Sequence, residues 1–290
     1  MESLGKAIFD SLVAKSRNNY EEGDYTDSEG FLCCGKCHTR KQQDITLPAF
    51  GTQPERVIRV GIACECRKKE LEAERAAEER RQFLQRMEVL RRDGITDPAY
   101  LRYTFDHDDN QNPEVSEVCR RYVEHWDDMF KDNIGILFYG GVGTGKSFLA
   151  CCIANALIEK LVPVSVTNFP RLLNKLQGLG FGEERQEFID KLQRYKLLVI
   201  DDLGVERDTS YSTEQVYNVI DTRSRSGRPL IITTNLSMDD MKNPPSLAHA
   251  RIYDRVLEMC PIRLKLVGES RRKTIANERR DKAKKLLGLK

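Results

Sequence analysis

The chain has 290 residues, a hydrophobic fraction of 40% and a formal net charge of +2. The hydrophobic fraction excludes a chain that is disordered because of its composition. The net charge is too small for the overall charge of the chain to determine its binding partner. No apolar run approaches the length of a membrane span, and the N-terminus lacks the apolar core of a signal peptide. We therefore expect a cytoplasmic protein of about two domains with no membrane partner. In a reducing compartment its nine cysteines are thiols or metal ligands rather than disulfides.

The N-terminal stretch contains two close pairs of cysteines, separated by 26 residues. The pairs are Cys34 and Cys37, and Cys64 and Cys66. Two such pairs can supply four thiolates to one tetrahedral Zn²⁺, and a module of this size needs such support because its own core is small. The C-x-C spacing of the second pair leaves open a thiol cluster, a redox pair, or a ligand position taken by Cys33 or His38. We predict a zinc-binding module over residues 1–66, with a strand at 57–60 under the metal.

Residues 67–92 are rich in Glu, Arg, Ala and Leu and contain neither Pro nor Gly, which predicts one long helix ending at Gly94. We interpret residues 67–99 as a helical connector, which is either a spacer or a partner-binding helix. The segment 100–105 is predicted to be extended, and a further helix is predicted to start at Pro113. The aromatic residues of this region can line a base pocket or pack in the core.

The central motif is G-x-x-x-x-G-K-[ST], which spans Gly140 to Ser147 between an apolar run at 134–139 and an apolar helix. Its glycines let backbone N–H groups form an anion nest, and the helix starting at Gly145 adds its positive N-terminal end. Lys146 places a positive charge on the β- and γ-phosphates, and the Ser147 hydroxyl can ligate Mg²⁺. The residues predicted to bind ATP are Gly140, Gly141, Val142, Gly143, Thr144, Gly145, Lys146, Ser147 and Phe148.

Four further apolar runs alternate with helical stretches, which predicts an α/β fold with a five-stranded, largely parallel sheet. The runs are 162–167, 196–200, 229–234 and 262–267. The second run ends in Asp201, which can hold the Mg²⁺ shell, and Asp202, which can polarise the attacking water. Asn235 closes the third run, where its amide can orient the water.

Two arginines, Arg251 and Arg255, lie at i and i+4 on one face of a predicted helix. Arginine is suited to stabilising the charge on a transferring phosphoryl group, including across a subunit boundary. The alternative is a solvated helix with internal ion pairs. Residues 271–290 carry nine Lys and Arg residues against Glu278 and Asp281, which predicts a short basic helix.

In their order along the chain, these motifs resemble the AAA+ ATPases of the DnaC/DnaI helicase-loader and IstB-like group over residues 100–275. The N-terminal cysteine module followed by a charged helix resembles the DnaC-like proteins of phages and integrative elements. The motifs that carry the resemblance are Gly140–Ser147, Asp201–Gly204, Thr233–Asn235, Arg251-x-x-x-Arg255 and Gly268–Arg272.

The resemblance implies an AAA+ ATPase domain over residues 100–290, with a reduced or absent C-terminal lid because few residues follow Arg272. It implies catalytic roles for Lys146, Asp201, Asp202, Asn235 and Arg255, with the last two acting as first sensor and arginine finger. It further implies that Arg272 is the second sensor and binds the nucleotide, although Arg271 occupies the aromatic position of the family pattern and remains an alternative. Asp202 is the second acid of the motif Asp201–Gly204, which corresponds to the Walker B motif of the family; many AAA+ proteins have Glu at this position.

By the same resemblance, we expect ATP-dependent loading of a hexameric replicative helicase onto single-stranded DNA during replication initiation. The cofactors implied are ATP, Mg²⁺ and Zn²⁺, and the protomers would self-associate through the ATP site. The alternatives are an IstB-type ATPase that regulates a transposase on DNA, and an ATP-switched adaptor with little turnover. A DNA-facing helix is expected between Phe169 and Phe181, where an amphipathic core helix is the alternative.

Overall fold

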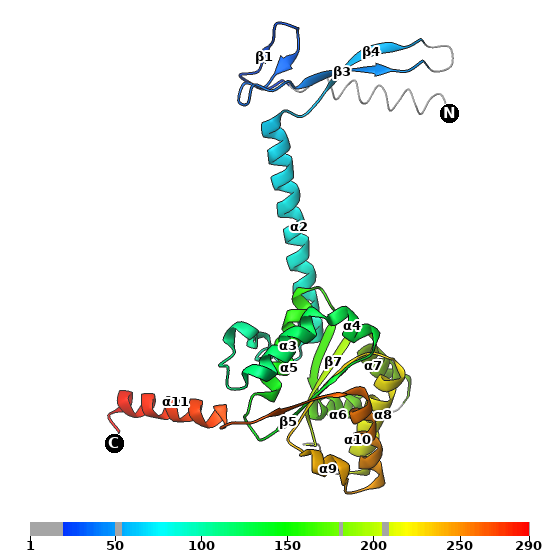
Figure 1. Cartoon of the computed structure of the whole chain (residues 1–290), viewed down its shortest axis with the longest axis vertical. Coiled ribbons are helices and arrows are strands. Elements are labelled where there is room, and N and C mark those ends of the chain that lie inside the picture. Colours follow the sequence, from blue (N-terminus) through cyan, green and yellow to red (C-terminus); the bar gives the residue numbers. More distant parts are fainter. Residues whose placement is uncertain (1–19, 50–53, 180–181, 205–208, 290) are drawn as a thin grey trace. The chain divides into compact units, whose positions relative to one another are not determined.

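The computed structural model describes residues 20–49, 54–179, 182–204 and 209–289 (Figure 1). The fold has two compact units, which divide between Leu84 and Gln85 within the helix α2. This helix runs from Glu65 to Gly94, which confirms the long helix predicted from the sequence. The division into a zinc module, a connector and an ATPase domain at residues 66 and 99 stays a prediction.

The first unit is built from two small antiparallel sheets. Strand β1 (Tyr25–Thr26) pairs with β2 (Leu32–Cys33), and β3 (Gln42–Leu47) pairs with β4 (Arg56–Gly61) over six residue pairs. The strand predicted at residues 57–60 lies within β4 and is confirmed. Such short strands bury little apolar surface, so the unit depends on polar contacts and on its cysteines.

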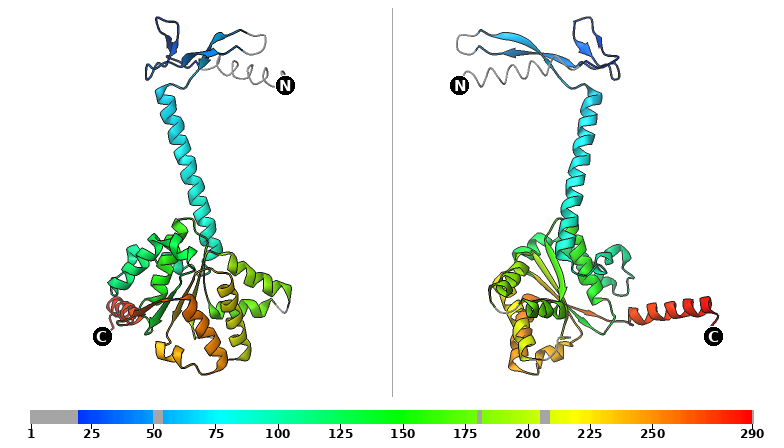
Figure 2. Two further views of the ribbon diagram at one scale, coloured as in Figure 1. Left: turned by 45° about the vertical axis from the view of Figure 1, so that its right-hand side comes forward. Right: turned by 180° about the vertical axis from the view of Figure 1, so that it is seen from behind.

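The second unit contains a five-stranded sheet with helices packed around it (Figure 2). Every neighbouring pair of its strands is parallel, and the strand order is β6-β7-β8-β5-β9. The strands are β5 (Ile136–Gly140), β6 (Val164–Asn168), β7 (Leu197–Leu203), β8 (Leu230–Thr234) and β9 (Ile262–Leu266). Each of the five apolar runs identified in the sequence forms one strand, so the predicted fold class is confirmed.

Helices cover both faces of this sheet, because alternate residues of its strands point to opposite sides. In β5, Ile136 and Phe138 pack with α3, α4 and α5, whereas Leu137 packs with α6, α7, α8 and α10 (Figure 1). The helices are α3 (Pro113–Glu124), α4 (Trp126–Lys131), α5 (Lys146–Glu159), α6 (Phe169–Gly178), α7 (Glu183–Arg194), α8 (Ser210–Arg225), α9 (Met238–Lys242), α10 (Leu247–Met259) and α11 (Arg271–Leu287). Among the described residues, none of the helices has both the length and the apolar character needed to cross a bilayer.

The segment 100–105, predicted to be extended, instead forms two short 3₁₀ turns, η1 (Tyr100–Arg102) and η2 (Phe105–His107). The Asp97 carboxylate accepts a hydrogen bond from the Ala99 N–H at 2.9 Å, which starts the first turn. The Asn155 amide, from α5, then donates to the carbonyls of Tyr100 and Tyr103 at 2.8 and 2.9 Å. The prediction of an extended segment was wrong, because these hydrogen bonds hold the backbone in turns that the pattern of aromatic residues does not indicate.

A buried arginine joins the start of two strands. Arg223, on α8, is 0% exposed, and its guanidinium donates to the backbone carbonyls of Pro229 at 2.6 Å and of Tyr195 and Lys196 at 3.0 Å each. These carbonyls precede β8 and β7. The arginine therefore supplies donors to three carbonyls where the two strands begin, and of these the Pro229 carbonyl also accepts the Leu198 N–H at 3.4 Å.

We predict that Arg223→Met lowers the free energy of unfolding by about 2–4 kcal/mol, because each buried carbonyl left without a donor costs about 1–3 kcal/mol. Urea denaturation followed by circular dichroism measures the loss. Arg225→Met is the matched control, since its side chain is 79% exposed and pairs with Asp221 at the surface of α8. Equal destabilisation by the two substitutions would contradict the role given to Arg223.

Candidate functional site

The loop between β5 and α5 has the backbone of a phosphate cradle. Gly143 and Gly145 have φ values of +80° and +102°, and Gly145 is the residue that precedes the first turn of α5. A Cβ at Gly143 would overlap Ser270, and one at Gly145 would overlap the guanidinium of Arg271. Only glycine fits both the dihedrals and the space. The N–H groups at this end of α5 are thus available to an anion.

The Lys146 side chain makes three hydrogen bonds within the site. Its ammonium donates to the carbonyls of Gly140 and Gly141 at 3.0 and 2.7 Å, and to the amide oxygen of Asn235 at 2.8 Å. Burial lowers the pKa of Lys146, while the charges of Asp202 and Asp201 oppose that shift. Lys146 and Asn235, the predicted sensor, are therefore in direct contact although they lie 89 residues apart.

The two acids lie at an irregularity near the end of β7, where its pairing with β8 shifts register between Ile200 and Leu203. Asp202 has a φ of +59°, and its N–H donates to the Thr233 hydroxyl at 2.9 Å. The same hydroxyl donates to Asp201 Oδ1 at 2.6 Å. Thr233 therefore connects both acids to β8 and turns their side chains in different directions.

The acids differ in their surroundings. Asp202 lines the cavity beside the cradle, and burial, followed by the charge of Asp201, raises the pKa of Asp202. Asp201 is only 5% exposed, and its second oxygen accepts a hydrogen bond from the Tyr100 hydroxyl at 3.0 Å. Carboxylate and hydroxyl oxygens are the ligands that Mg²⁺ prefers, so Asp201 and Ser147 fit that ion by the chemistry of their donor atoms.

The cavity has a volume of about 660 Å³. Its polar part is formed by the cradle, Asp202 and Asn235, and its aromatic part includes Tyr103 and Phe148, whose ring centroids are 5.4 Å apart. A charged part and an aromatic part suit the triphosphate and the base of a nucleotide. The lining residues are Tyr103, His107, Asp109, Gln111, Val142, Gly143, Gly145, Lys146, Ser147, Phe148, Asp202, Asn235, Arg271, Arg272 and Glu278.

The two arginines at the start of α11 have different environments. The Arg271 backbone N–H donates to the Gly143 carbonyl at 3.0 Å, and its guanidinium donates to the Thr144 carbonyl at 2.8 Å and pairs with Asp109. Arg272 is exposed and lines the cavity. Arg271 is thus bonded to the cradle itself, while Arg272 has the freedom to reach a ligand.

Arg255, the predicted finger, is on α10 and does not line the cavity of its own chain. It donates to Glu258 at 2.9 Å, its Nε lies 3.7 Å from an oxygen of Asp221, and its side chain is 40% exposed. The structure therefore brings together Lys146, Ser147, Asp202, Asn235 and Arg272 around one cavity, with Asp201 directly behind it, and leaves Arg255 elsewhere. Their functional roles stay predictions.

Two residues that hold the acids were given no role by the sequence analysis. Thr233 belongs to the motif Thr233–Asn235, in which only Asn235 was given a function, and its position at a strand end was the available signal. Tyr100 lies 101 positions before Asp201, and no local pattern connects the two.

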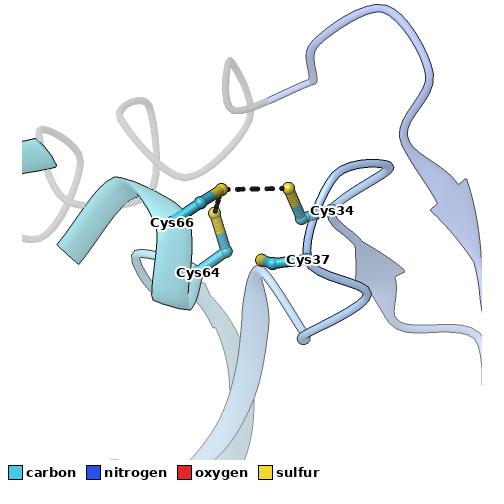
Figure 3. A group of neighbouring side chains, drawn as sticks. All are labelled: Cys34, Cys37, Cys64 and Cys66. Carbon is cyan, nitrogen blue, oxygen red and sulfur yellow. Dashed lines mark hydrogen bonds between the residues drawn. The ribbon is translucent and has the colours of Figure 1, made fainter. Parts of the chain in front are cut away.

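The four predicted zinc ligands form one cluster in the first unit (Figure 3). The sulfur atoms of Cys34, Cys37, Cys64 and Cys66 all lie within 4.8 Å of one another, and Cys66 Sγ is 3.4 Å from Cys34 Sγ and 3.3 Å from Cys64 Sγ. Tetrahedral Zn²⁺ with bonds of about 2.3 Å needs sulfurs at such separations.

Charge also favours a cation in this cluster. The Thr39 hydroxyl lowers the pKa of Cys37 to about 5, and the neighbouring thiols of Cys64, Cys34 and Cys37 raise the pKa of Cys66 to about 12. Four thiolates would repel one another unless a metal ion offset their charge. Cys33 instead faces Asp27, 3.8 Å away, and neither it nor His38 belongs to the metal-binding group found among the described residues.

The loop that carries the first cysteine pair is fixed by a buried ion pair. Lys41 donates to Asp24 at 2.7 Å and lowers the pKa of Asp24 to about 2, and the same carboxylate accepts the Gly35 N–H at 3.1 Å. A Cβ at Gly35 would overlap the Gly23 carbonyl, so the turn between Cys34 and Cys37 requires glycine at that position.

Comparison with known proteins identifies relatives of this arrangement. The profile of the family described as "IstB-like ATP binding protein" matches residues 68–279. The replicative helicase loader DnaC of Buchnera aphidicola (Schizaphis graminum) is 29% identical over 176 residues, which cover 58% of this chain and 68% of the relative. DnaC of Escherichia coli K12 is 30% identical over 141 residues, which cover 48% of this chain and 55% of the relative.

The crystal structure of DnaI matches with a TM-score of 0.52 and 22% identity, covering 61% of this chain and 95% of that structure. At this identity the likeness concerns the fold. The match to DnaC of Escherichia coli spans about half of that relative's length.

We predict that the chain purified without chelator contains about one zinc ion, because the four thiolates complete a tetrahedral shell. Elemental analysis by mass spectrometry measures the content. Cys37→Ser should lose most of the metal, whereas Cys33→Ser, outside the cluster, should keep it. A zinc content near zero in the parent protein would refute the site.

We predict that Lys146→Ala weakens binding of a fluorescent ATP analogue at least about tenfold, or 1.4 kcal/mol, because the cradle loses its only ammonium. The far-ultraviolet circular dichroism should not change. Lys160→Ala, just after the opposite end of α5, is the matched control and should bind normally; its ammonium donates to the Val123 carbonyl. Normal binding by Lys146→Ala would exclude Lys146 from the site.

Proposed function

The chain belongs to the family of IstB-like ATP-binding proteins, and from this premise we propose that it is an ATP-dependent loader of a replicative DNA helicase. Two relatives that share about 30% identity with it are named replicative helicase loaders. The observation in the structure that supports the proposal most is the convergence of Lys146, Asp202 and Asn235 on one cavity at the carboxyl edge of a parallel sheet. That edge is where nucleotides bind in folds of this type.

In this proposal the cradle binds the phosphates of ATP and the chain hydrolyses it. Lys146 exchanges its carbonyl partners for phosphate oxygens, and Asn235, its neighbour, orients the attacking water. Asp202 accepts a proton from that water, a task helped by the raised pKa of its carboxyl. Ser147 and Asp201 would hold Mg²⁺, which offsets the charge of the phosphates when bound.

We propose that a neighbouring protomer completes the site through Arg255. This arginine is exposed and absent from its own chain's cavity, which is the arrangement that a residue acting in trans requires. Its ion pairs with Glu258 and Asp221 orient it on the surface of α10. Self-association would then couple hydrolysis to assembly.

We propose that the first unit and α2 bind a hexameric helicase. On α2, Phe83, Leu84 and Val89 are 41%, 46% and 45% exposed, which is unusual for three large apolar side chains within seven residues. The zinc-binding module, which precedes these residues in the sequence, would present a rigid surface to a partner. Both features suit protein contact more than catalysis.

For single-stranded DNA, α11 is the surface that charge favours. It carries eight Lys and Arg residues against two acids, and the side chains from Ala276 to Leu287 are exposed. Such a helix neutralises phosphates without reading sequence. In α6, by contrast, Phe169, Leu172 and Leu176 are buried in the core, so these residues pack rather than face DNA; Phe181 lies outside the described residues.

The proposal is tested by affinity purification of the tagged chain from its host with ATP present. We expect recovery of the replicative helicase, and a loss of at least about tenfold with Lys146→Ala as bait, because ATP binding then fails. Quantitative mass spectrometry compares the two baits. Recovery of a transposase instead would favour the IstB-type alternative, and equal helicase recovery with both baits would contradict ATP dependence.

A further inference from the structure

The carboxylate of Asp201 is held at both oxygens. Thr233, on the neighbouring strand, donates to Oδ1 at 2.6 Å, and the Tyr100 hydroxyl donates to Oδ2 at 3.0 Å. With Asp201 only 5% exposed, these two donors fix the rotation of the carboxylate about its side-chain bond. Thr233 belongs to the strand end that carries the sensor, but Tyr100 belongs to none of the sequence motifs.

Tyr100 is itself fixed from the helix that follows the cradle. The Asn155 side chain, 1% exposed on α5, donates to the backbone carbonyls of Tyr100 and Tyr103 at 2.8 and 2.9 Å. A single amide thus closes both ends of the η1 turn. The backbone that carries the Tyr100 side chain is therefore held by α5, whose first residue is Lys146.

The same turn contributes to the wall of the nucleotide cavity. The ring centroid of Tyr100 is 5.9 Å from that of Tyr103, which is 5.4 Å from that of Phe148. Tyr103 and Phe148 line the cavity, whereas Tyr100 does not. Tyr100 consequently contacts the aromatic wall with its ring and the acid with its hydroxyl.

The hydroxyl acts as donor to the acid. A tyrosine phenol carries its proton at neutral pH, since its usual pKa is about 10. A carboxylate accepts only, so the proton of this hydrogen bond belongs to Tyr100.

We propose that Tyr100 is a positioning residue, which orients the Asp201 carboxylate toward magnesium and thereby links the aromatic wall of the cavity to the metal side. The inference rests on the proposed ATP site. Partners in the outer shell of a metal determine the orientation of its ligands, and their loss commonly costs about 10–100-fold in metal affinity. Without the hydroxyl, Asp201 keeps Thr233 as its side-chain donor among the described residues and can rotate away from the ion.

The test is Tyr100→Phe, which keeps the ring and removes only the hydroxyl. A fluorescent ATP analogue, trinitrophenyl-ATP, is titrated with Mg²⁺, and the Mg²⁺ concentration at half-maximal tightening of binding is measured. We expect this midpoint to rise about tenfold. The affinity for the analogue in the presence of EDTA should stay within twofold, since the aromatic wall remains.

Tyr195→Phe is the matched control, because it removes another half-buried hydroxyl, bonded to the Asp93 carbonyl at 2.8 Å, and should leave the midpoint unchanged. In the background of Asp201→Asn, Tyr100→Phe should have no further effect if it acts through that acid. An unchanged or lowered midpoint in Tyr100→Phe, or an equal rise in both backgrounds, would overturn the proposal. Because the readout is nucleotide binding, failure to recover a helicase leaves this test intact.

Discussion

The ammonium group of Lys146 is the point on which the arrangement of the second unit depends. It donates to three oxygens: the carbonyl of Gly140 at the end of β5, the carbonyl of Gly141 in the loop that follows, and the amide of Asn235 just after β8. That contact is possible only because β5 and β8 are neighbours and parallel, so that both chains leave the sheet at the same edge. β7, on the other side of β8, brings its acids to the same edge.

The charges of Lys146 and the two acids explain why these side chains are held by several hydrogen-bond partners. Burial lowers the pKa of Lys146 and raises that of Asp202, so burial favours the neutral form of each; an anionic phosphate would offset this shift for Lys146, and a cation would offset it for Asp202. Thr233, which joins the two acids, and Arg271, which is bonded to the cradle carbonyls of Gly143 and Thr144, keep the surrounding backbone in place. Under the proposed function, this rigidity orients the phosphates in advance.

Much of the fold was predictable because its signals are local. Each apolar run formed a strand, the cradle motif lies between a strand and a helix, and the acids and Asn235 lie at strand ends. The turn at 100–107 was not predictable, since Asn155, about fifty residues later, determines it. For the same reason Tyr100 carried no signal: its contact with Asp201 exists only once β7 and α5 have packed.

The cysteine cluster could likewise be predicted only in part from the sequence. Their spacing predicted the members of the cluster, but only the fold shows which partners Cys33 and Cys34 contact. Cys33 is the last residue of β2 and faces Asp27, while Cys34 lies in the loop that follows and faces Cys66.

The most direct measurement of the central claim is a crystal structure of the full chain grown with Mg²⁺ and a non-hydrolysable ATP analogue. The account predicts the triphosphate along Gly140–Ser147, with Lys146 Nζ bonded to the β- or γ-phosphate and the Asp201 carboxylate, still held by Tyr100 and Thr233, beside the metal. An empty cradle, or a nucleotide bound away from Lys146 and Asp201, would contradict it.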